Sequence, residues 1–408
     1  MQFSVKRDVL LKSLNFAQGV VEKKNTLPIL SNVLLQLKNN KFSIVATDLD
    51  IIFYDEITEV KILKEGSTTT SAAILYDILR KIASNSELNF ELKTENKLSL
   101  KSDNSDFNLL CLPTDNFPTF ADEFEGQEIS LNNNRFLKLL NKTRISISND
   151  DTRHYLNGIF LHLTEAHGRQ FLTGVATDSH RLSSSSLEID KNDFAPLILP
   201  RKTVFQLCSL LTEIPEQLMM QTSENKIKFT LGKMKLISKV IDGKFPDYKK
   251  VVPTTNDKIL KVSSKDFINS IERVASVSLD RKEGVKLVIS KDNVQLSVNS
   301  ANSGEGNEKI KAEFSSDNIN ISFNSKYLID IASEIEDRNL KINLKDSVSP
   351  VLIEDLSDKN SYYVIMPMKI WNFEISEFNL FFALKMLIHN HFKSMNLDAI
   401  LSCDKKMI

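Results

Sequence analysis

The sequence predicts an α+β protein in which three similar domains follow one another, each with two helices packed on antiparallel sheets. An apolar pattern recurs roughly every 130 residues, close to the length of one domain. Short strands of alternating polarity outnumber the helices and mostly follow one another directly, which favours antiparallel pairing. The chain has 408 residues, which is more than one hydrophobic core usually holds.

Each repeat opens with the same apolar spacing. One apolar residue is followed by two more, five and nine positions later: Val5, Leu10 and Leu14; Leu131, Phe136 and Leu140; Val262, Phe267 and Ile271. This spacing predicts a short strand and then an amphipathic helix. We expect these helices at residues 7–19, 133–143 and 264–275, with Asn133 and either Ser263 or Ser264 as N-caps.

The repeats continue in a common order. Two alternating strands are expected in each, at residues 32–37 and 41–47, 158–163 and 170–177, and 285–290 and 294–298. A second helix follows at 72–82, 201–211 and 325–335, and further strands come at 88–92, 98–102, 227–231 and 235–240. The tripeptide Ala-Thr-Asp follows a strand twice, at residues 46–48 and 176–178.

These repeats predict domains at residues 1–127, 128–257 and 258–370, with 371–408 as a C-terminal extension. The linkers near 120–128 and 253–258 are short and not rich in Gly or Ser. We therefore expect the domains to be held in a fixed relative geometry.

Composition narrows the class of protein. The formal net charge is −1, so the average surface gives no sign of nucleic-acid binding. The three cysteines, Cys111, Cys208 and Cys403, form no C-x-x-C pair, which argues against a zinc ribbon and suits a reducing cytosol. No signal peptide is recognised, and no stretch reaches the ~18 apolar residues of a membrane-spanning helix. We expect a cytoplasmic protein.

The predicted helices carry cations on their polar faces, whereas acidic residues gather in loops and strands. Lys23 and Lys24 follow the first helix. The helical cations are Lys6, Arg7, Lys12, Arg80, Lys81, Arg135, Lys138, Lys142, Arg144, Arg201, Lys202, Lys265, Arg273 and Lys326. For any one helix, a solvated face explains them. Across three repeats, the bias favours a basic surface that holds phosphates without reading bases.

Candidate catalytic groups are few. Asp178, His180 and Ser183 lie within six residues, but a serine nucleophile and its base usually converge from separate elements. His389 and His391 lack a third ligand nearby for a metal. The two glycines of residues 303–307 lack the spacing of a phosphate-binding fingerprint. The sequence therefore predicts no catalytic site, no metal and no cofactor.

Four separated segments resemble those of a known protein family. They are Tyr155-Leu156-Asn157-Gly158, Ala176-Thr177-Asp178-Ser179-His180-Arg181-Leu182, Gly243-Lys244-Phe245-Pro246-Asp247-Tyr248 and Val364-Ile365-Met366-Pro367-Met368-Lys369. With Thr26-Leu27-Pro28-Ile29-Leu30 near the start, they resemble the bacterial DNA polymerase III beta subunit, the sliding clamp. The resemblance covers residues 1–370 and implies the DNA-clamp fold.

The resemblance also implies a function. Two chains would meet head to tail as a homodimer, giving a ring of six domains whose helices line a central hole. Such a ring is a non-catalytic processivity factor for DNA replication that slides on duplex DNA without sequence preference. Residues similar to the DNA-contacting ones of the family are Lys24, His154 and Tyr155. The subunit contact would bring Phe107 and Leu109 of one chain to Val277 of the other.

The family also has a partner-binding groove between its second and third domains. The groove accepts a short linear motif, polar-Leu-x-Leu-Phe, from the DNA polymerase III catalytic subunit, the clamp loader, other polymerases and repair proteins. The matching residues here are Leu156, Thr177, His180, Arg181, Leu182, Pro246, Lys250, Val251, Val364, Ile365, Met366, Pro367 and Met368. A groove walled by Met and Pro adapts to many apolar partners.

The chain departs from the family at three places. Ser179 stands where many relatives have Gly, and Lys250 where Arg is common. The chain also continues past Ile370, where members usually stop. Within the extension, residues 377–381 loosely match the polar-Leu-x-Leu-Phe pattern, so the extension could compete for the groove. A mobile appendage, or a marginal helix packed on the surface, is the simpler interpretation.

Two rival functions stay open on the sequence. One is a three-domain adaptor that binds proteins without encircling DNA, and the other is a hydrolase centred on Asp178 and His180. Release from a linearised DNA circle would separate the ring from the adaptor. Loss of turnover in His180→Ala would identify the hydrolase.

Overall fold

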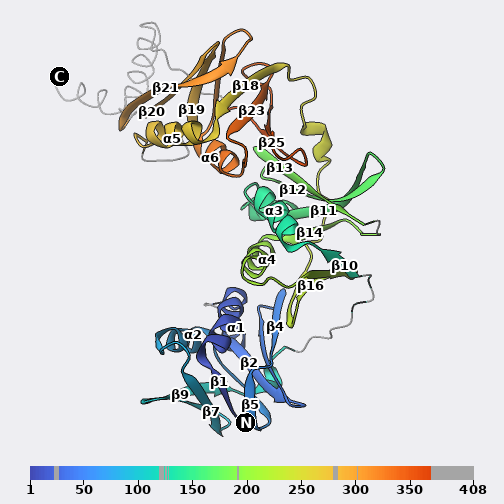
Figure 1. Ribbon diagram of the computed structural model, residues 1–408, viewed down its shortest axis with the longest axis vertical. Helices are drawn as coiled ribbons and strands as arrows, with labels where there is room; N and C mark the ends of the chain where they lie inside the picture. Colours follow the sequence, from blue (N-terminus) through green and yellow to red (C-terminus); the bar gives the residue numbers. More distant parts are fainter. Residues whose placement is uncertain are drawn as a thin grey trace, which may run out of the picture. The chain divides into compact units, whose positions relative to one another are not determined.

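The computed structural model of the chain is shown in Figure 1. It describes residues 1–22, 27–118, 124, 126, 128–190, 193–278, 284–300 and 302–368. The described residues belong to one compact unit, Met1–Met368. The predicted extension 371–408, with its candidate motif and its histidines, lies outside the described residues, and so does Lys24.

The first repeat contains two helices, α1 (Arg7–Val20) and α2 (Ala72–Lys81). Its strands are β1 (Gln2–Lys6), β2 (Asn32–Lys38), β3 (Lys41–Thr47), β4 (Ile51–Ile57), β5 (Val60–Lys64), β6 (Gly66–Ser71), β7 (Glu87–Thr94), β8 (Lys97–Ser102) and β9 (Ser105–Leu112). Short 3-10 helices, η1 (Pro28–Ser31) and η2 (Thr114–Asn116), lie in the connections.

The second repeat has α3 (Asn133–Arg144) and α4 (Arg201–Glu213). Its strands are β10 (Glu128–Leu131), β11 (Gly158–Ala166), β12 (Arg169–Thr177), β13 (Arg181–Ile189), β14 (Leu197–Pro200), β15 (Leu218–Thr222), β16 (Lys226–Leu231) and β17 (Met234–Lys239). The 3-10 helices η3 (Asp151–Leu156) and η4 (Tyr248–Val251) precede β11 and follow β17.

The third repeat has α5 (Ser264–Ala275) and α6 (Ser325–Ser333). Its strands are β18 (Lys258–Ser263), β19 (Gly284–Ser290), β20 (Asn293–Ser300), β21 (Gly304–Phe314), β22 (Ile319–Asn324), β23 (Asn339–Leu344), β24 (Val351–Asp355) and β25 (Ser361–Ile365). All strand pairs in the described residues are antiparallel, as the direct succession of short strands predicts.

The sheets cross from one repeat to the next. In the described residues one sheet has 13 strands and the other 12. β4 of the first repeat pairs with β17 of the second, and β13 of the second pairs with β25 of the third. The two junctions therefore use corresponding strands, and each joins neighbouring repeats by main-chain hydrogen bonds.

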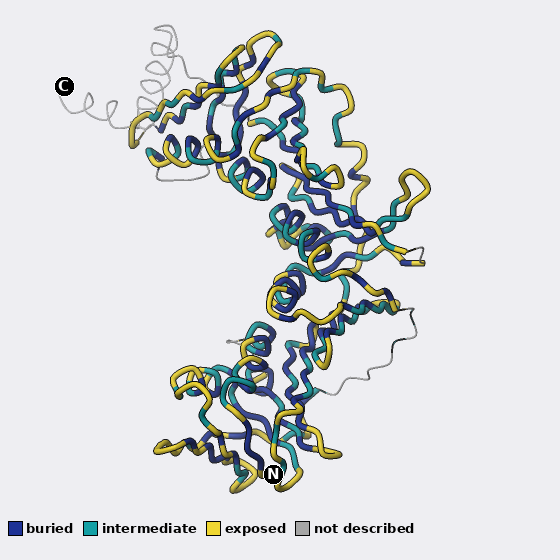
Figure 2. Tube along the Cα trace, in the orientation of Figure 1, coloured by how far each residue is buried: buried dark blue, intermediate teal, exposed yellow. Residues whose placement is uncertain are grey.

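The helices cover the sheets on their apolar sides. α1 packs on β3 and β4, α3 on β12 and β13, and α5 on β20 and β21. Figure 2 shows the buried residues concentrated where helices and strands face one another, with exposed turns between them. One apolar cluster spans the first and second repeats, and a separate one fills the third.

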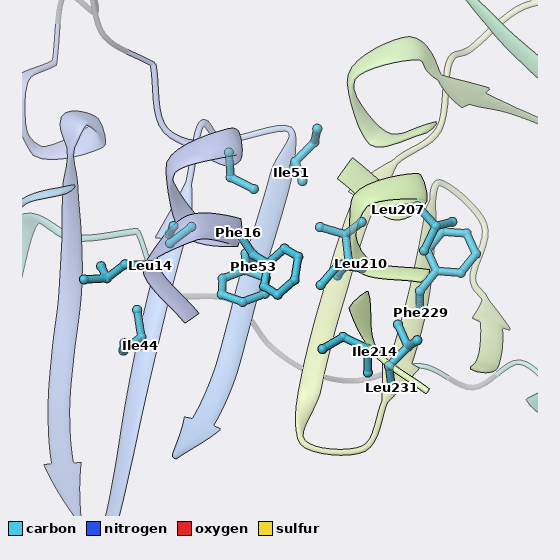
Figure 3. Packing of buried hydrophobic residues seen from close by; sticks show 14 of the residues in the cluster. Leu14, Phe16, Ile44, Ile51, Phe53, Leu207, Leu210, Ile214, Phe229 and Leu231 are labelled. Atoms are coloured by element: carbon cyan, nitrogen blue, oxygen red, sulfur yellow. The ribbon is translucent and has the colours of Figure 1, made fainter. Parts of the chain in front are cut away.

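Figure 3 shows part of the larger cluster. Phe16 of α1 and Phe53 of β4 lie together, with ring centroids 6.1 Å apart. Leu207 and Leu210 of α4 come from the second repeat and belong to the same cluster. Because α1 contacts α4, the first junction is supported by helix packing as well as by strand pairing.

The helix ends differ slightly from those expected. Asn132, and not Asn133, is the N-cap of α3: its backbone is extended and its side chain accepts the N–H of Arg135 at 3.1 Å. The Asn133 amide donates instead to the carbonyls of Ile214 and Glu216. Ser263 caps α5 by accepting the N–H of Asp266 at 3.3 Å, as expected.

Several helical cations do not lie on open basic faces. Lys142 has only 2% of its side chain exposed and contacts Asp355 and Asp358 of the third repeat. Lys202 contacts Asp48 of the first repeat and donates to the Val20 carbonyl at 2.7 Å. The expectation of a solvated face was wrong for Lys142, because helical periodicity does not reveal acids supplied by another repeat.

Candidate functional site

A groove of about 210 Å³ lies at the junction of the second and third repeats. It is lined by Thr177, Ser179, His180, Arg181, Leu182, Pro246, Asp247, Tyr248, Val251, Val364 and Met366. Its wall is mostly apolar. Most of its polar groups lie at the turn between β12 and β13, and Asp247 adds a carboxylate beside η4. The junction therefore offers a pocket suited to apolar side chains with a polar rim.

Strand pairing brings the two sides of the groove together. Leu182 of β13 is directly opposite Val364 of β25 in the antiparallel register. The Met366 N–H donates to the carbonyl of His180 at 2.8 Å, which extends this pairing by one bond past the strand end. Residues 186 positions apart in sequence thus line one pocket because the sheet continues across the junction.

The segment before η4 supplies the third side. Phe245 is buried and its ring stacks on Phe160, with centroids 4.9 Å apart. The Tyr248 hydroxyl and the Nε2 of His162 are 3.0 Å apart. Burial and neighbouring acidic groups raise the pKa of Tyr248 to about 12, so its phenol stays neutral. Phe245 and Tyr248 therefore fix Pro246, which lies between them, at the groove wall.

The turn from residue 177 to 181, which we call the groove turn, is held by its own side chains. The Asp178 Oδ1 accepts the N–H groups of His180 at 3.0 Å and Arg181 at 2.9 Å. The Thr177 hydroxyl donates to the Arg181 carbonyl at 2.7 Å. Ser179 has a φ of 76°, in the left-handed region that favours Gly.

Arg181 places a buried positive charge in the wall of the groove. Its side chain is 8% exposed, its Nε donates to the Asp178 Oδ2 at 3.1 Å, and its Nη1 donates to the Asp330 Oδ2 at 2.8 Å. The guanidinium carbon lies 4.1 Å from the centroid of the Tyr327 ring. Burial raises the pKa of Tyr327, and so does the nearby Asp178. The buried cation is thus matched by two carboxylates and one aromatic face.

Eight of the thirteen groove residues expected from sequence line this pocket: Thr177, His180, Arg181, Leu182, Pro246, Val251, Val364 and Met366. Leu156 is buried in the apolar cluster behind the groove, with Val364 and Tyr248. Ile365 lies in the core of the third repeat, because neighbouring strand residues face opposite ways. Lys250 is exposed and pairs with Asp247 at 3.2 Å.

Pro367 and Met368 directly follow the lining residue Met366 but are not among the lining residues of this pocket. Sequence reasoning missed Ser179, Asp247 and Tyr248 as groove residues, although all three lie in the segments that carry the resemblance.

The two described DNA-contact candidates lie on η3. His154 is exposed and its ring Nε2 lies 3.2 Å from the Asp242 carbonyl. Its ring meets that of Tyr155 edge-on, with centroids 5.9 Å apart. The preceding residue, Arg153, donates to the Ser179 Oγ at 2.6 Å. The segment that carries these aromatic residues therefore also touches the groove turn.

The three subunit-contact candidates lie in the first and third repeats. Phe107 of β9 is half-buried and lines a cavity of about 610 Å³ next to α2. Leu109 is 6% exposed within the core. Val277 is half-buried after α5, close to Gly306 of β21: a Cβ added to Gly306 would lie 3.4 Å from Val277 Cγ1.

The geometry does not support a Ser-His-Asp triad. Ser183 is fully buried on β13 and its hydroxyl bonds to the Ser146 hydroxyl at 2.6 Å. The Asp178 carboxylate bonds to the groove turn and to Arg181. Among the hydrogen bonds of the described residues, none joins His180 to Ser183. These groups therefore form a turn and a core contact.

Comparison with known proteins identifies the family. Residues 1–121 match the N-terminal domain of the DNA polymerase III beta subunit, residues 130–247 its central domain and residues 249–369 its C-terminal domain. The chain belongs to the DNA polymerase III beta subunit family. The suspected resemblance and the clamp fold are thereby confirmed.

Curated relatives in this family are beta sliding clamps. The beta sliding clamp of Caulobacter vibrioides is 34% identical over 374 residues, covering 91% of this chain and all of the relative. That of Escherichia coli K12 is 33% identical over 371 residues, again covering 91% of this chain and all of the relative. Like them, the chain is a DNA polymerase processivity factor.

Solved clamp structures have the same fold. The Caulobacter crescentus beta sliding clamp with bound polyethylene glycol has a TM-score of 0.87 at 34% identity, covering 91% of this chain and 99% of that one. The sliding clamp of Bartonella birtlesii bound to griselimycin also has a TM-score of 0.87, at 37% identity, covering 91% of this chain and all of that one. The beta subunit fold thus accounts for the described residues.

Two negative findings concern only the part of the chain that the structure describes. No helix there is both long and apolar enough to cross a membrane. No group of three or more His, Cys, Asp or Glu side chains there could hold a metal ion.

Proposed function

We propose that this processivity factor acts as a homodimeric ring around duplex DNA, and that its groove receives short linear motifs from replication partners. The ring is non-catalytic and works in the cytoplasm, where it needs no cofactor. The observation that carries this proposal is the use of corresponding strands at both junctions of one chain.

The internal repeat indicates how two chains would meet. The groove turn, residues 177–181, has a counterpart at residues 47–51, and we call both of them Thr-Asp turns. β4 and β13 begin at the ends of these two turns, and β21 holds the corresponding position in the third repeat. β17 and β25 are the last strands of their repeats, and β9 is the last strand of the first. Since β17 pairs with β4 and β25 with β13, the third pairing of this kind would join β9 of one chain to β21 of another.

Both strands have room for such a partner. β9 pairs with β8 along its length, but with β6 only at Cys111 and Leu112. β21 pairs with β20 along residues 304–311, but with β18 only from Ala312 to Phe314. Within the described residues, the first part of each strand therefore has a neighbour on one side only. Two chains related by a twofold axis would satisfy both edges and close the ring.

The subunit contact would bury apolar surface beside these strands. The cavity next to Phe107 is lined by Ile74, Ile78 and Ile82 of the first repeat and is large enough for an apolar side chain. Val277 lies next to β21, so pairing of β21 with β9 would bring it to this cavity. Such a pairing would bring Phe107 of one chain to Val277 of the other, the contact that the family resemblance implies. Leu109, which is already buried, would support the strand from its own core.

A closed ring can hold DNA with weak contacts. Because a circular topology prevents escape, contacts to phosphates can be few and non-specific, which allows sliding. We assign this role to Lys24, His154 and Tyr155 and to exposed helical cations such as Lys12 and Lys265. The cations that are paired across the junctions hold the repeats together instead.

The groove would tether the polymerase. An apolar wall of Leu182, Pro246, Val251, Val364 and Met366 suits the large apolar side chains, two Leu and one Phe, of a polar-Leu-x-Leu-Phe motif. The DNA polymerase III catalytic subunit, the clamp loader, other polymerases and repair proteins would use it in turn. Leu156, Ile365, Pro367 and Met368 would support the wall, and Lys250 would act at its rim.

Primer extension on a long single-stranded circle tests this function. With the cognate polymerase and clamp loader, the chain should lengthen the products made in one binding event. Met366→Asp, which puts a charge in the groove, should abolish this lengthening but leave the dimer intact. An unchanged product length with Met366→Asp would contradict the tethering role of the groove.

A further inference from the structure

Arg181 links the groove turn to a helix of the third repeat. The guanidinium contacts Asp178 in the turn and Asp330 on α6, and it lies over Tyr327 of the same helix. Asp330 itself does not line the groove, and its other partner is Lys326, one helical turn away, at 3.1 Å. A residue outside the pocket thus bonds to the side chain that forms part of its wall.

The first repeat contains the same turn and shows what Arg181 adds. In residues 47–51 the Leu49 φ is 81°, the Asp48 Oδ1 accepts the N–H groups of Asp50 and Ile51, and the Lys239 N–H donates to the Asp50 carbonyl at 2.8 Å. Each of these bonds has its counterpart in the groove turn. Ile51, which is buried, occupies the place of Arg181. The turn therefore forms without an arginine, and the arginine must serve another purpose.

Both turns are tied to the second helix of the following repeat. At the first junction Lys202 of α4 contacts the turn carboxylate Asp48. At the second junction the two charges change places: α6 supplies the carboxylate, Asp330, and the turn supplies the cation, Arg181. Such an ion pair fixes the position of the turn relative to the next repeat. At the second junction, this position sets the distance between the two groove walls.

We propose that Asp330 is a positioning residue for the partner-binding groove. It holds Arg181, and through Arg181 the backbone of Ser179 and His180, at the spacing from β25 that a bound motif requires. This role rests on the proposed function of the groove. Without the Asp330 charge, Asp178 is the one ionic partner left to the 8%-exposed guanidinium among the described residues. The guanidinium then turns outward to be solvated, and the groove turn moves with it.

The test uses the full-length chain and a fluorescein-labelled synthetic peptide that contains Gln-Leu-Ser-Leu-Phe, read by fluorescence polarisation. Asp330→Asn keeps the shape of the side chain and removes its charge, and it should weaken peptide binding roughly tenfold. Asp330→Glu, which restores the charge, should recover most of the affinity. Amide hydrogen exchange at His180 and Arg181 should be faster in Asp330→Asn than in the wild type.

Asp48→Asn is the matched control. It removes the charge of the corresponding tie at the first junction, far in sequence from the groove, and should leave peptide affinity unchanged. If Asp330→Asn binds the peptide within twofold of the wild type, or if Asp48→Asn weakens binding equally, the proposal is wrong.

Two further outcomes remain distinct. Failure of the wild type to bind the peptide would overturn the groove function itself, and the role of Asp330 with it. If Asp330→Asn does not fold, peptide binding by Tyr327→Leu is measured instead, because this variant removes the aromatic ring that lies against Arg181. Binding within twofold of the wild type would then show that the proposal is wrong.

Discussion

Lys142 of α3 and Asp355 of β24 form a buried ion pair between the second and third repeats, with Nζ and Oδ2 3.0 Å apart. Asp358 adds a second carboxylate at 2.9 Å. Removing one partner of such a pair leaves a buried charge without compensation. The second junction is therefore sensitive to the loss of a single charge.

Lys142→Ala should lower the free energy of unfolding by about 3–5 kcal/mol, because Asp355 would remain buried without its cation. Urea unfolding followed by circular dichroism measures this. Lys138→Ala is the control: Lys138 contacts Asp358 from the more exposed side of the same helix, and its loss should cost about 1 kcal/mol or less. Equal losses of unfolding free energy in the two variants would contradict the special role of the buried pair.

The same pair predicts a pH dependence. Burial opposes ionisation of Asp355, but hydrogen bonds from Ser357, the Glu336 N–H and Lys142 outweigh it and lower the pKa to about 2. A carboxyl with a lowered pKa adds stability above its unfolded-state pKa, and this stability is lost as the pH falls toward about 2.

The wild type should therefore lose stability between about pH 4 and pH 2 more steeply than Asp355→Asn, which has no carboxyl to protonate. Thermal unfolding across this range measures the difference. Parallel curves for the two proteins would show that Asp355 does not titrate as proposed.

Ser179 allows a comparison of strain with hydrogen bonding. Ser179→Ala keeps the left-handed backbone and loses the exposed bond from Arg153, so it should cost about 1 kcal/mol or less of unfolding free energy. Ser179→Gly loses the same bond but relieves about 1 kcal/mol of backbone strain, so it should be nearer to the wild type. Denaturant unfolding ranks the variants, and a glycine variant less stable than the alanine variant would contradict the strain argument.

Phe107→Asp should prevent dimer formation, because it places a charge in the proposed subunit contact. Light scattering after size-exclusion chromatography should give about twice 46.3 kDa for the wild type and 46.3 kDa for the variant. Leu63→Asp, on β5 away from β9, changes an equally apolar and more exposed residue and should leave the dimer intact. A dimeric Phe107→Asp variant would rule out this contact.

The helices and strands were largely predictable because their periodicity is local. The expected span of α5 agrees with the structure, and α1 and α3 differ by one residue at the C-terminal end. The Thr-Asp turn could be recognised as a repeat before its conformation was known. The division into three domains at residues 127 and 257 remains a prediction, since the described chain forms one compact unit.

The groove was only partly predictable from sequence. Its residues came from the family resemblance, but which of them line the pocket depends on alternation along β25, where Val364 faces the groove and Ile365 the core. Asp355, which pairs with Lys142, and Asp330, which pairs with Arg181, lie more than 140 positions away from these cations and in another repeat. No local pattern reveals such pairs, because they depend on how the sheets continue across the junctions.

Encirclement of DNA is tested most directly by release from a cut circle. The chain is loaded by its clamp loader onto a nicked circular duplex, freed of unbound protein by gel filtration, and the DNA is then linearised. The account predicts that the protein stays on the circle and leaves the linear DNA through its ends. Equal retention on circular and linear DNA would contradict a ring.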